Sequence, residues 1–176
     1  KGFWYVYTGG NDSLGGHGNW FAIKKNVHKT ISGTFTKRLF QVSEGGTLIL
    51  NHLILTRGHA FEGDGGAILV DGENALLNTS NCKFIGNMAT ALRTRIFGRG
   101  GAIAVNKHAQ VNILNSIFSK NVADLHGGGI FGTTRVNLNI GASQFVENKA
   151  FGGVGGAIYV TEQSALFLLQ SELKYN

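Results

Sequence analysis

The stretch RGGAIAVNKHAQVNILNSIFSKNVA, Arg99–Ala123, contains the pattern from which the fold can be inferred. It begins with a glycine pair and ends near Phe-Ser-Lys-Asn, with few chemically reactive side chains between them. The stretches Gly65–Ala89, Gly127–Ala150 and Gly155–Asn176 repeat this pattern with small changes. Such a repeat is either a catalytic motif, a ligand-binding motif or a scaffold.

Three positions recur in register through these stretches. An isoleucine follows the glycines, a phenylalanine lies 15 or 16 residues later, and an asparagine lies three residues after the phenylalanine. The members are Ile68, Ile103, Ile130 and Ile158, then Phe84, Phe118 and Phe145, and then Asn87, Asn121, Asn148 and Asn176. The register extends toward the N-terminus, because Leu39–Val42 aligns with Ala67–Val70 and an earlier turn is visible near Phe21.

Within each repeat the apolar residues alternate with a period of two, which indicates β-strands. Ile103 and Val105 define one short strand, Val111 and Ile113 a second, and Phe118 lies in a third. Three short strands in a repeat of this length predict one coil of a parallel β-helix. We therefore predict an all-β fold, a right-handed single-stranded parallel β-helix of about six coils.

We assign residues 1–20 to an N-terminal cap or lead-in segment. Residues 21–176 form the predicted β-helix domain, which we expect to be part of a longer chain or of an assembly, since no terminal cap is visible near Asn176. Coils stack about 4.8 Å apart, so equivalent positions lie over one another. The isoleucines and phenylalanines then form inward columns, the asparagines form a hydrogen-bonded ladder, and the glycine pairs occupy a tight corner.

The single cysteine excludes an internal disulfide framework and any multi-cysteine zinc site. Cys82 aligns with Ser116, Ser143 and Ser171, so we expect a buried, unreactive thiol. The six histidines lack metal-ligand spacing, and we expect no metal and no cofactor. No apolar run reaches the roughly 18 residues that cross a bilayer, so no transmembrane segment is expected in this chain.

The motif Gly-Gly-Ala-Ile, followed by Phe-x-x-Asn, resembles the repeat of chlamydial polymorphic outer-membrane proteins. It is also similar to the wider set of pectin-lyase-like right-handed β-helix repeats. The resemblance covers about residues 21–176 and implies a secreted or surface-exposed domain. The same fold carries adhesins, structural proteins and polysaccharide-cleaving enzymes, so the resemblance implies the fold more strongly than the function.

One corner of the predicted coils carries ionisable groups. Asp64, Arg99 and His126 each precede a glycine pair on successive coils, and Asp124 lies two residues before His126. A carboxylate, arginine and histidine cluster is where an active site is expected if the protein is an enzyme. The simpler interpretation is a column of salt-bridged turns, and we assign no catalytic residue.

Two further groups are candidates for binding. Arg93, Arg95 and Arg99 lie in or beside a long loop, and Trp4 and Tyr5 lie in an aromatic segment that either caps the first coil or stacks on a partner. Asn11 and Asn78 begin N-glycosylation sequons, which are used only in a eukaryotic secretory route.

Together these features predict a non-enzymatic extracellular or cell-surface module with a structural or adhesive role, possessing an interaction face and able to assemble end to end. The alternative is a carbohydrate-active enzyme, a lyase or glycosidase, or a glycan-binding module. The expected partner is another protein, a second copy or a glycan. The net charge of +6 favours anionic partners, but no nucleic-acid motif accompanies it.

Overall fold

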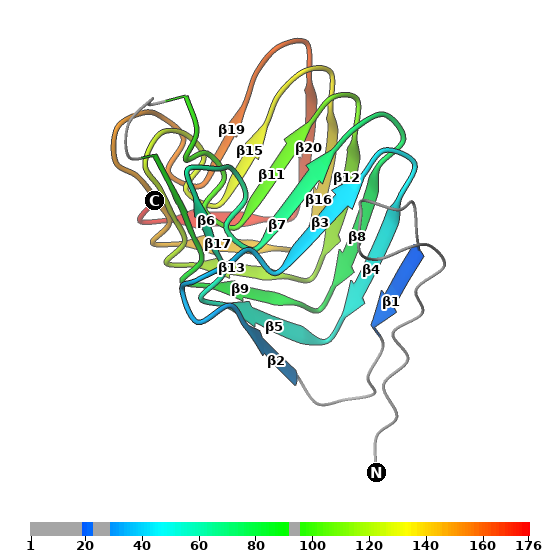
Figure 1. The fold of residues 1–176 in the computed structure, drawn as a ribbon, viewed down its shortest axis with the longest axis horizontal. Coiled ribbons are helices and arrows are strands. Elements are labelled where there is room, and N and C mark those ends of the chain that lie inside the picture. The colour runs from blue at the N-terminus through cyan, green and yellow to red at the C-terminus, as the bar shows by residue number, and fades with distance from the viewer. Residues whose placement is uncertain (1–18, 23–28, 92–95) are drawn as a thin grey trace.

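The protein forms a stack of β-coils in the computed structural model, which describes residues 19–22, 29–91 and 96–176. In the described chain the strands form four sheets, which we call A to D, and every neighbouring pair of strands is parallel. Figure 1 shows the coils stacked along the sheets, with the C-terminal end at one side of the stack. The sheets hold four to six strands each, which gives about five turns, close to the six predicted.

A complete coil passes through sheets C, A, B and D in that order. Sheet C contains β3 (Phe40–Ser43), β7 (Ile68–Asp71), β11 (Ile103–Asn106), β15 (Ile130–Gly132) and β19 (Ile158–Val160). Sheet A contains β1 (Asn19–Ala22), β4 (Thr47–Asn51), β8 (Leu76–Ser80), β12 (Gln110–Leu114), β16 (Asn137–Gly141) and β20 (Ala165–Leu169). Sheet B contains β2 (Lys29–Ser32), β5 (Leu53–Thr56), β9 (Lys83–Ile85), β13 (Ile117–Ser119), β17 (Gln144–Val146) and β21 (Glu172–Lys174).

Sheet D is a fourth sheet, which the prediction of three strands in each repeat does not contain. It consists of β6 (His59–Phe61), β10 (Met88–Thr90), β14 (Val122–Ala123) and β18 (Lys149–Ala150). β10, β14 and β18 directly follow the asparagines of the ladder, and β6 follows Gly58 at the equivalent position. At two or three residues they are too short to show an alternating pattern in the sequence.

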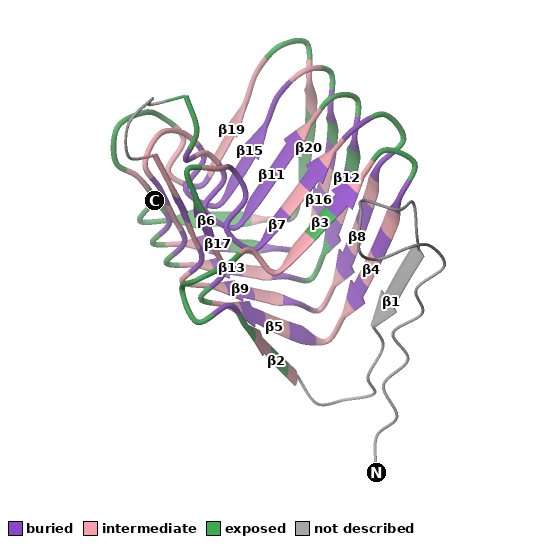
Figure 2. Cartoon of the chain, in the orientation of Figure 1, coloured by how far each residue is buried: buried purple, intermediate pink, exposed green. Residues whose placement is uncertain are grey.

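The predicted inward columns are present in the core. Ile103 pairs with Ile68 on one side and with Ile130 on the other, and all three are fully buried. The rings of Phe84, Phe118 and Phe145 stack with centroid separations of 4.5 and 4.6 Å. Figure 2 shows buried residues alternating with less buried ones along the strands, as expected when every second side chain points inward.

The asparagine ladder is also confirmed. The Nδ2 of Asn87 donates to Oδ1 of Asn121 at 2.9 Å, and Nδ2 of Asn121 donates to Oδ1 of Asn148 at 2.8 Å. Each Oδ1 also accepts a backbone N–H from the preceding coil, so these buried amides are fully used. Buried polar groups stabilise a fold only when they are paired, and the repeat provides the partners.

The glycine pair makes the corner before sheet C. Gly65 has a φ of 71°, and Gly100, Gly127 and Gly155 at the equivalent positions have similar positive values. The second glycine serves a different purpose, since a Cβ on Gly66 would collide with the backbone oxygens of Met88 and Gly101. Glycine at both positions therefore lets successive coils stack closely.

Candidate functional site: a groove on sheet C

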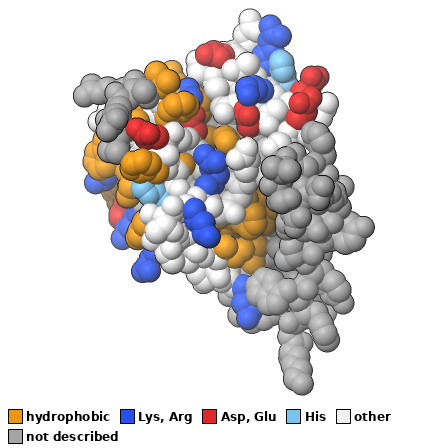
Figure 3. Space-filling model, viewed as in Figure 1, with side chains coloured by type: hydrophobic (Ala, Val, Ile, Leu, Met, Phe, Trp, Pro, Cys, Tyr) orange, Lys and Arg blue, Asp and Glu red, His pale blue; other side chains and the backbone are white. Residues whose placement is uncertain are grey.

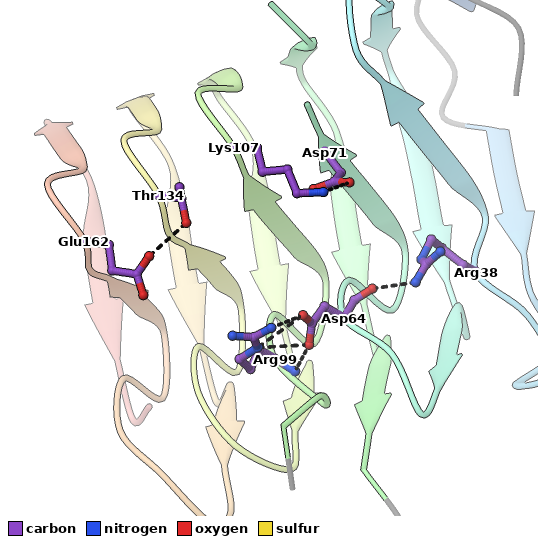
Figure 4. A network of polar contacts seen from close by, with 7 residues as sticks. All are labelled: Arg38, Asp64, Asp71, Arg99, Lys107, Thr134 and Glu162. Carbon is purple, nitrogen blue, oxygen red and sulfur yellow. Dashed lines mark hydrogen bonds and ion pairs between the residues drawn. The ribbon is translucent and has the colours of Figure 1, made fainter. Parts of the chain in front are cut away.

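A groove of about 440 Å³ lies over the outer face of sheet C. Its charged lining residues are Arg38, Arg99, Lys107, Asp64, Asp71 and Glu162. Acidic and basic side chains are interspersed on the face drawn in Figure 3. Figure 4 shows that the lining residues come from successive coils, so the stacking of the coils creates the groove.

The strongest contact in the groove joins Asp64 to Arg99. The guanidinium Nη2 of Arg99 lies 2.6 Å from Oδ2 of Asp64, and its Nε donates to both carboxylate oxygens at 3.1 and 3.2 Å. The backbone N–H of Arg99 donates to Oδ1 at 2.9 Å. The Asp64 side chain is only 7% exposed, so this carboxylate is locked in place by one neighbouring coil.

Arg38 holds the same corner from the coil on the other side. Its Nη2 donates to the backbone oxygen of Asp64 at 2.8 Å, and its Nε donates to that of Gly65 at 3.0 Å. Burial lowers the pKa of Arg38, and the charge of Asp64 opposes this shift. Arg38 and Arg99 therefore lie on opposite sides of Asp64, as Figure 4 shows.

Aromatic side chains continue from this pair across the outer face of sheet C. The guanidinium of Arg99 lies 4.6 Å from the ring centroid of Phe131, a cation–π geometry. Tyr159 stacks beside Phe131 at 6.0 Å and on the ring of His126 at 4.7 Å. Phe131 is only 2% exposed, because the Arg99 guanidinium and neighbouring side chains cover its ring. The ring is therefore a buried surface on which the Arg99 guanidinium packs.

Two more polar pairs line the upper part of the groove. Lys107 Nζ lies 3.1 Å from Oδ2 of Asp71, and Thr134 Oγ1 donates to Oε2 of Glu162 at 2.8 Å. Hydrogen bonds from Thr134 and Thr133, together with the charge of Arg99, lower the pKa of Glu162. Glu162 is therefore ionised near neutral pH. Figure 4 shows the Lys107–Asp71 and Thr134–Glu162 pairs on the same face as Asp64.

The four residues named as candidates for an active site, should the protein be an enzyme, do not converge. Asp64 and Arg99 form the pair described above. Asp124 lies at a different depression, where its Oδ2 accepts the backbone N–H of Ala91 at 2.8 Å. His126 stacks on Tyr159, and its Nδ1 accepts the backbone N–H of Val154 at 3.1 Å. Neither Asp124 nor His126 lines the groove.

Trp4, Tyr5, Asn11, Arg93 and Arg95 lie outside the residues that the structure describes.

Asn78 lies on the outer face of sheet A, in a second asparagine ladder. Its Oδ1 accepts Nδ2 of Asn112 at 2.8 Å, and Oδ1 of Asn112 accepts Nδ2 of Asn139 at the same distance. A glycan on Asn78 would have to fit beside this ladder.

Arg38, Lys107 and Glu162 line the groove but were not predicted as site residues from the sequence. The signal that points to them is their register: Lys107 and Glu162 follow the ends of β11 and β19, and Arg38 precedes β3, all in one sheet.

Within residues 19–22, 29–91 and 96–176, no group of three histidine, cysteine or carboxylate side chains could hold a metal ion. In the same part of the chain, no helix is long and apolar enough to cross a membrane.

The chain is thus a parallel β-solenoid built from one repeat type, with a polar groove on one sheet. Residues 115–133 match the family model described as the Chlamydia polymorphic membrane protein repeat. This stretch contains Phe118, Asn121 and the glycines before Ile130, so the match confirms the resemblance to that repeat.

The chain is also similar to the probable autotransporter YfaL of Escherichia coli (strain K12). The two are 38% identical over 68 residues, which cover 36% of this chain and 5% of YfaL. The chain thus matches a small part of a much longer relative. No solved structure matches the chain.

Proposed function

We propose that this chain is a surface or outer-membrane β-helix module whose sheet C groove binds a hydroxyl-rich glycan without cleaving it. The similarity to the Chlamydia polymorphic membrane protein repeat and to a probable autotransporter supports the location. The arrangement of charges in the groove supports the binding role, and it is the observation on which the proposal rests.

The charges that line the groove compensate one another. Three cationic and three carboxylate side chains line it, and Asp64 and Asp71 are each paired with a cation. An anionic ligand gains little in such a site, although the whole chain carries a charge of +6. Sugar hydroxyls both donate and accept, so they suit a surface where Lys107, Thr133, Thr134 and Glu162 alternate.

The positions of the carboxylates favour binding over hydrolysis. Glycosidases hold two carboxyl groups roughly 5–10 Å apart. Asp71 and Glu162 lie three coils apart, from β7 through β11 and β15 to β19, which corresponds to about 14 Å at the usual strand spacing. Asp64, the third carboxylate, already accepts hydrogen bonds from both the side chain and the backbone of Arg99.

The adhesive role follows if the groove captures glycans on another cell or matrix.

The test is a binding and turnover measurement on a panel of neutral and acidic polysaccharides, with wild type, Lys107→Ala and Lys120→Ala. Lys120 is a matched control, since its side chain is 67% exposed against 66% for Lys107 and each lysine pairs with a carboxylate. We expect a neutral glycan to bind, Lys107→Ala to weaken binding about tenfold, and Lys120→Ala to leave it unchanged.

New reducing ends or unsaturated products would contradict the proposal and favour the alternative, a glycosidase or polysaccharide lyase. Binding that both lysine variants retain would place the glycan site elsewhere. Failure of every polysaccharide to bind would reject the glycan and leave a protein as the expected partner.

A further inference from the structure

The outer face of sheet A carries a separate depression of about 400 Å³. Its lining residues come from five neighbouring strands, β4 to β20, and none of those that the structure describes is ionisable. The outer side chains alternate with buried ones along each strand. A coil stacked on either side therefore extends this face without covering it.

The outer asparagine ladder crosses this depression and ends within the sheet. Nδ2 of Asn112 donates to Oδ1 of Asn78, and Nδ2 of Asn139 donates to Oδ1 of Asn112. The next residues in the same column are Ile49 beside Asn78 and Phe167 beside Asn139, and neither can continue a chain of amides. Among the described residues, Oδ1 of Asn139 therefore has no donor and Nδ2 of Asn78 has no acceptor.

An apolar hollow lies beside the Asn139 end of the ladder. Gly141 is two residues further along β16, on the same face, and its neighbours in the adjacent strands are Leu114 and Leu169. A Cβ at Gly141 would meet Cδ1 of Leu114 at 3.2 Å and no other atom of the described chain within 4 Å. Leu114 is 51% exposed although β12 has a strand on each side, so the hollow has apolar walls and opens to solvent.

These groups suit a peptide better than a sugar. A peptide residue brings one N–H and one carbonyl together with its side chain, whereas a sugar ring brings several hydroxyls that each need a partner when buried. The hydroxyl of Ser80, also on this face, already donates to Oδ1 of Asn51. Asn78 and Asn139 lie two strands apart, about 10 Å at the usual spacing, which about three residues of extended chain would span.

We propose that the outer face of sheet A binds an extended, uncharged peptide segment of a partner protein through one aliphatic side chain. This side chain occupies the hollow over Gly141, between Leu114 and Leu169. A backbone N–H at or beside the same residue donates to Oδ1 of Asn139, and a carbonyl about three residues away accepts from Nδ2 of Asn78. The site is separate from the sheet C groove, and neither proposal depends on the other.

The test is an NMR titration of the isotope-labelled protein with the blocked peptide acetyl-Ser-Ser-Leu-Ser-Ser-amide at millimolar concentration. We expect saturable shifts of the side-chain amide of Asn139 and of the backbone amides of Leu114 and Gly141. One control peptide has glycine in place of leucine. The other is methylated on the backbone nitrogens of leucine and its two neighbours. Each should bind about tenfold more weakly, because the hollow stays empty or the acceptor stays unpaired.

A matched pair of variants tests the hollow itself. Gly141→Leu fills it with the residue that the same column holds at Leu114 and Leu169, so the fold should accept the change. We expect peptide binding to weaken about tenfold. Ser119→Leu adds the same side chain to the outer face of sheet B, between two aliphatic residues of its column, and should bind the peptide as wild type does.

Lys107→Ala, in the sheet C groove, should leave peptide binding unchanged, which separates this site from the glycan site. Equal binding of the three peptides, or binding that Gly141→Leu retains, would overturn the proposal. Absence of shifts on this face with the leucine peptide would also overturn it. The same shifts with the disaccharide cellobiose would show a sugar site and reject the peptide.

Discussion

Buried side-chain amides hold neighbouring coils in register. Asn121 is fully buried, and its amide group contacts both adjacent coils. Its Oδ1 accepts two hydrogens from Asn87, and its Nδ2 donates to Asn148 and to the backbone oxygen of Phe84. Asn121 therefore adds side-chain hydrogen bonds between coils to the backbone hydrogen bonds of the short strands.

Removal of this amide should therefore be costly. We expect Asn121→Ala to lower the free energy of unfolding by about 3 kcal/mol, because several buried partners lose their hydrogen bonds. Asn112→Ala is the matched control, since Asn112 occupies the outer ladder of the same coil and is only partly buried. It should cost about 1 kcal/mol. Equal losses in urea unfolding would contradict the structural role of the inner ladder.

Cys82 gives a prediction on pH. Burial raises the pKa of the Cys82 thiol to about 11, against smaller effects of hydrogen bonding with the backbone of Leu53, Ser80 and His52, which lower it. The unfolded thiol loses its proton first as pH rises, so stability is present below about pH 9 and falls between about pH 9 and about pH 11. The fall should be about 2 kcal/mol.

Other groups titrate in this range, so the measurement compares wild type with Cys82→Ser, the residue of the same column in the next coil. We expect the variant to lack this part of the alkaline loss, and we expect thiol reagents to label wild type only after unfolding. Rapid labelling of the native protein near neutral pH would show that the thiol is accessible.

The strands are short elements that depend on their neighbours. Those of sheets B and D have two to four residues, and their order comes from packing against the coils on either side. The phenylalanine stack is one such contact in sheet B, with ring planes 6° and 7° apart. Parallel stacking of rings in one column follows from the in-register pairing of β9, β13 and β17.

Phe118 lies in the middle of this stack. Phe118→Ala should cost about 4 kcal/mol, because it leaves a cavity between two buried rings. Phe118→Leu should cost less than half as much, since leucine occupies the same column at Leu55 and Leu173. Thermal or urea unfolding of the two variants tests this order, and a tolerated alanine would show that the stack contributes little.

The corner between β6 and β7 depends on the ion pair of Asp64. We expect Asp64→Ala to cost about 3 kcal/mol, because Arg99 is left partly buried without its partner. Asp71→Ala should cost less than about 1 kcal/mol, since Lys107 is largely exposed. A small loss for Asp64→Ala in the same unfolding assay would mean that Arg38 and Phe131 suffice to hold this corner.

Across the whole molecule, the repeat makes the fold predictable from sequence. In-register stacking places equivalent residues next to one another, so the spacing of Asn87, Asn121 and Asn148 is enough to predict a ladder, and their hydrogen bonds confirm it. The same logic places Asp64 beside Arg99.

The rest of the site was not predictable in this way. The direction of a side chain in a turn depends on backbone conformations that the repeat pattern does not show. Lys107 and His108 have φ values of 54° and 62°, and such a turn carries Lys107 over Asp71. Asp124 and His126 lie in one loop, yet their side chains contact different parts of the molecule.

We propose above that the outer face of sheet C is the functional surface and that it binds a glycan without turnover. An NMR titration of the isotope-labelled 18.8 kDa chain with the neutral glycan that binds best would locate the glycan on the molecule. We predict amide shifts at Lys107, Thr134 and Glu162, no shifts in the Lys120–Glu147 turn, and an unchanged glycan spectrum over time. Shifts confined to another sheet, or signals of cleaved glycan, would show that this assignment is wrong.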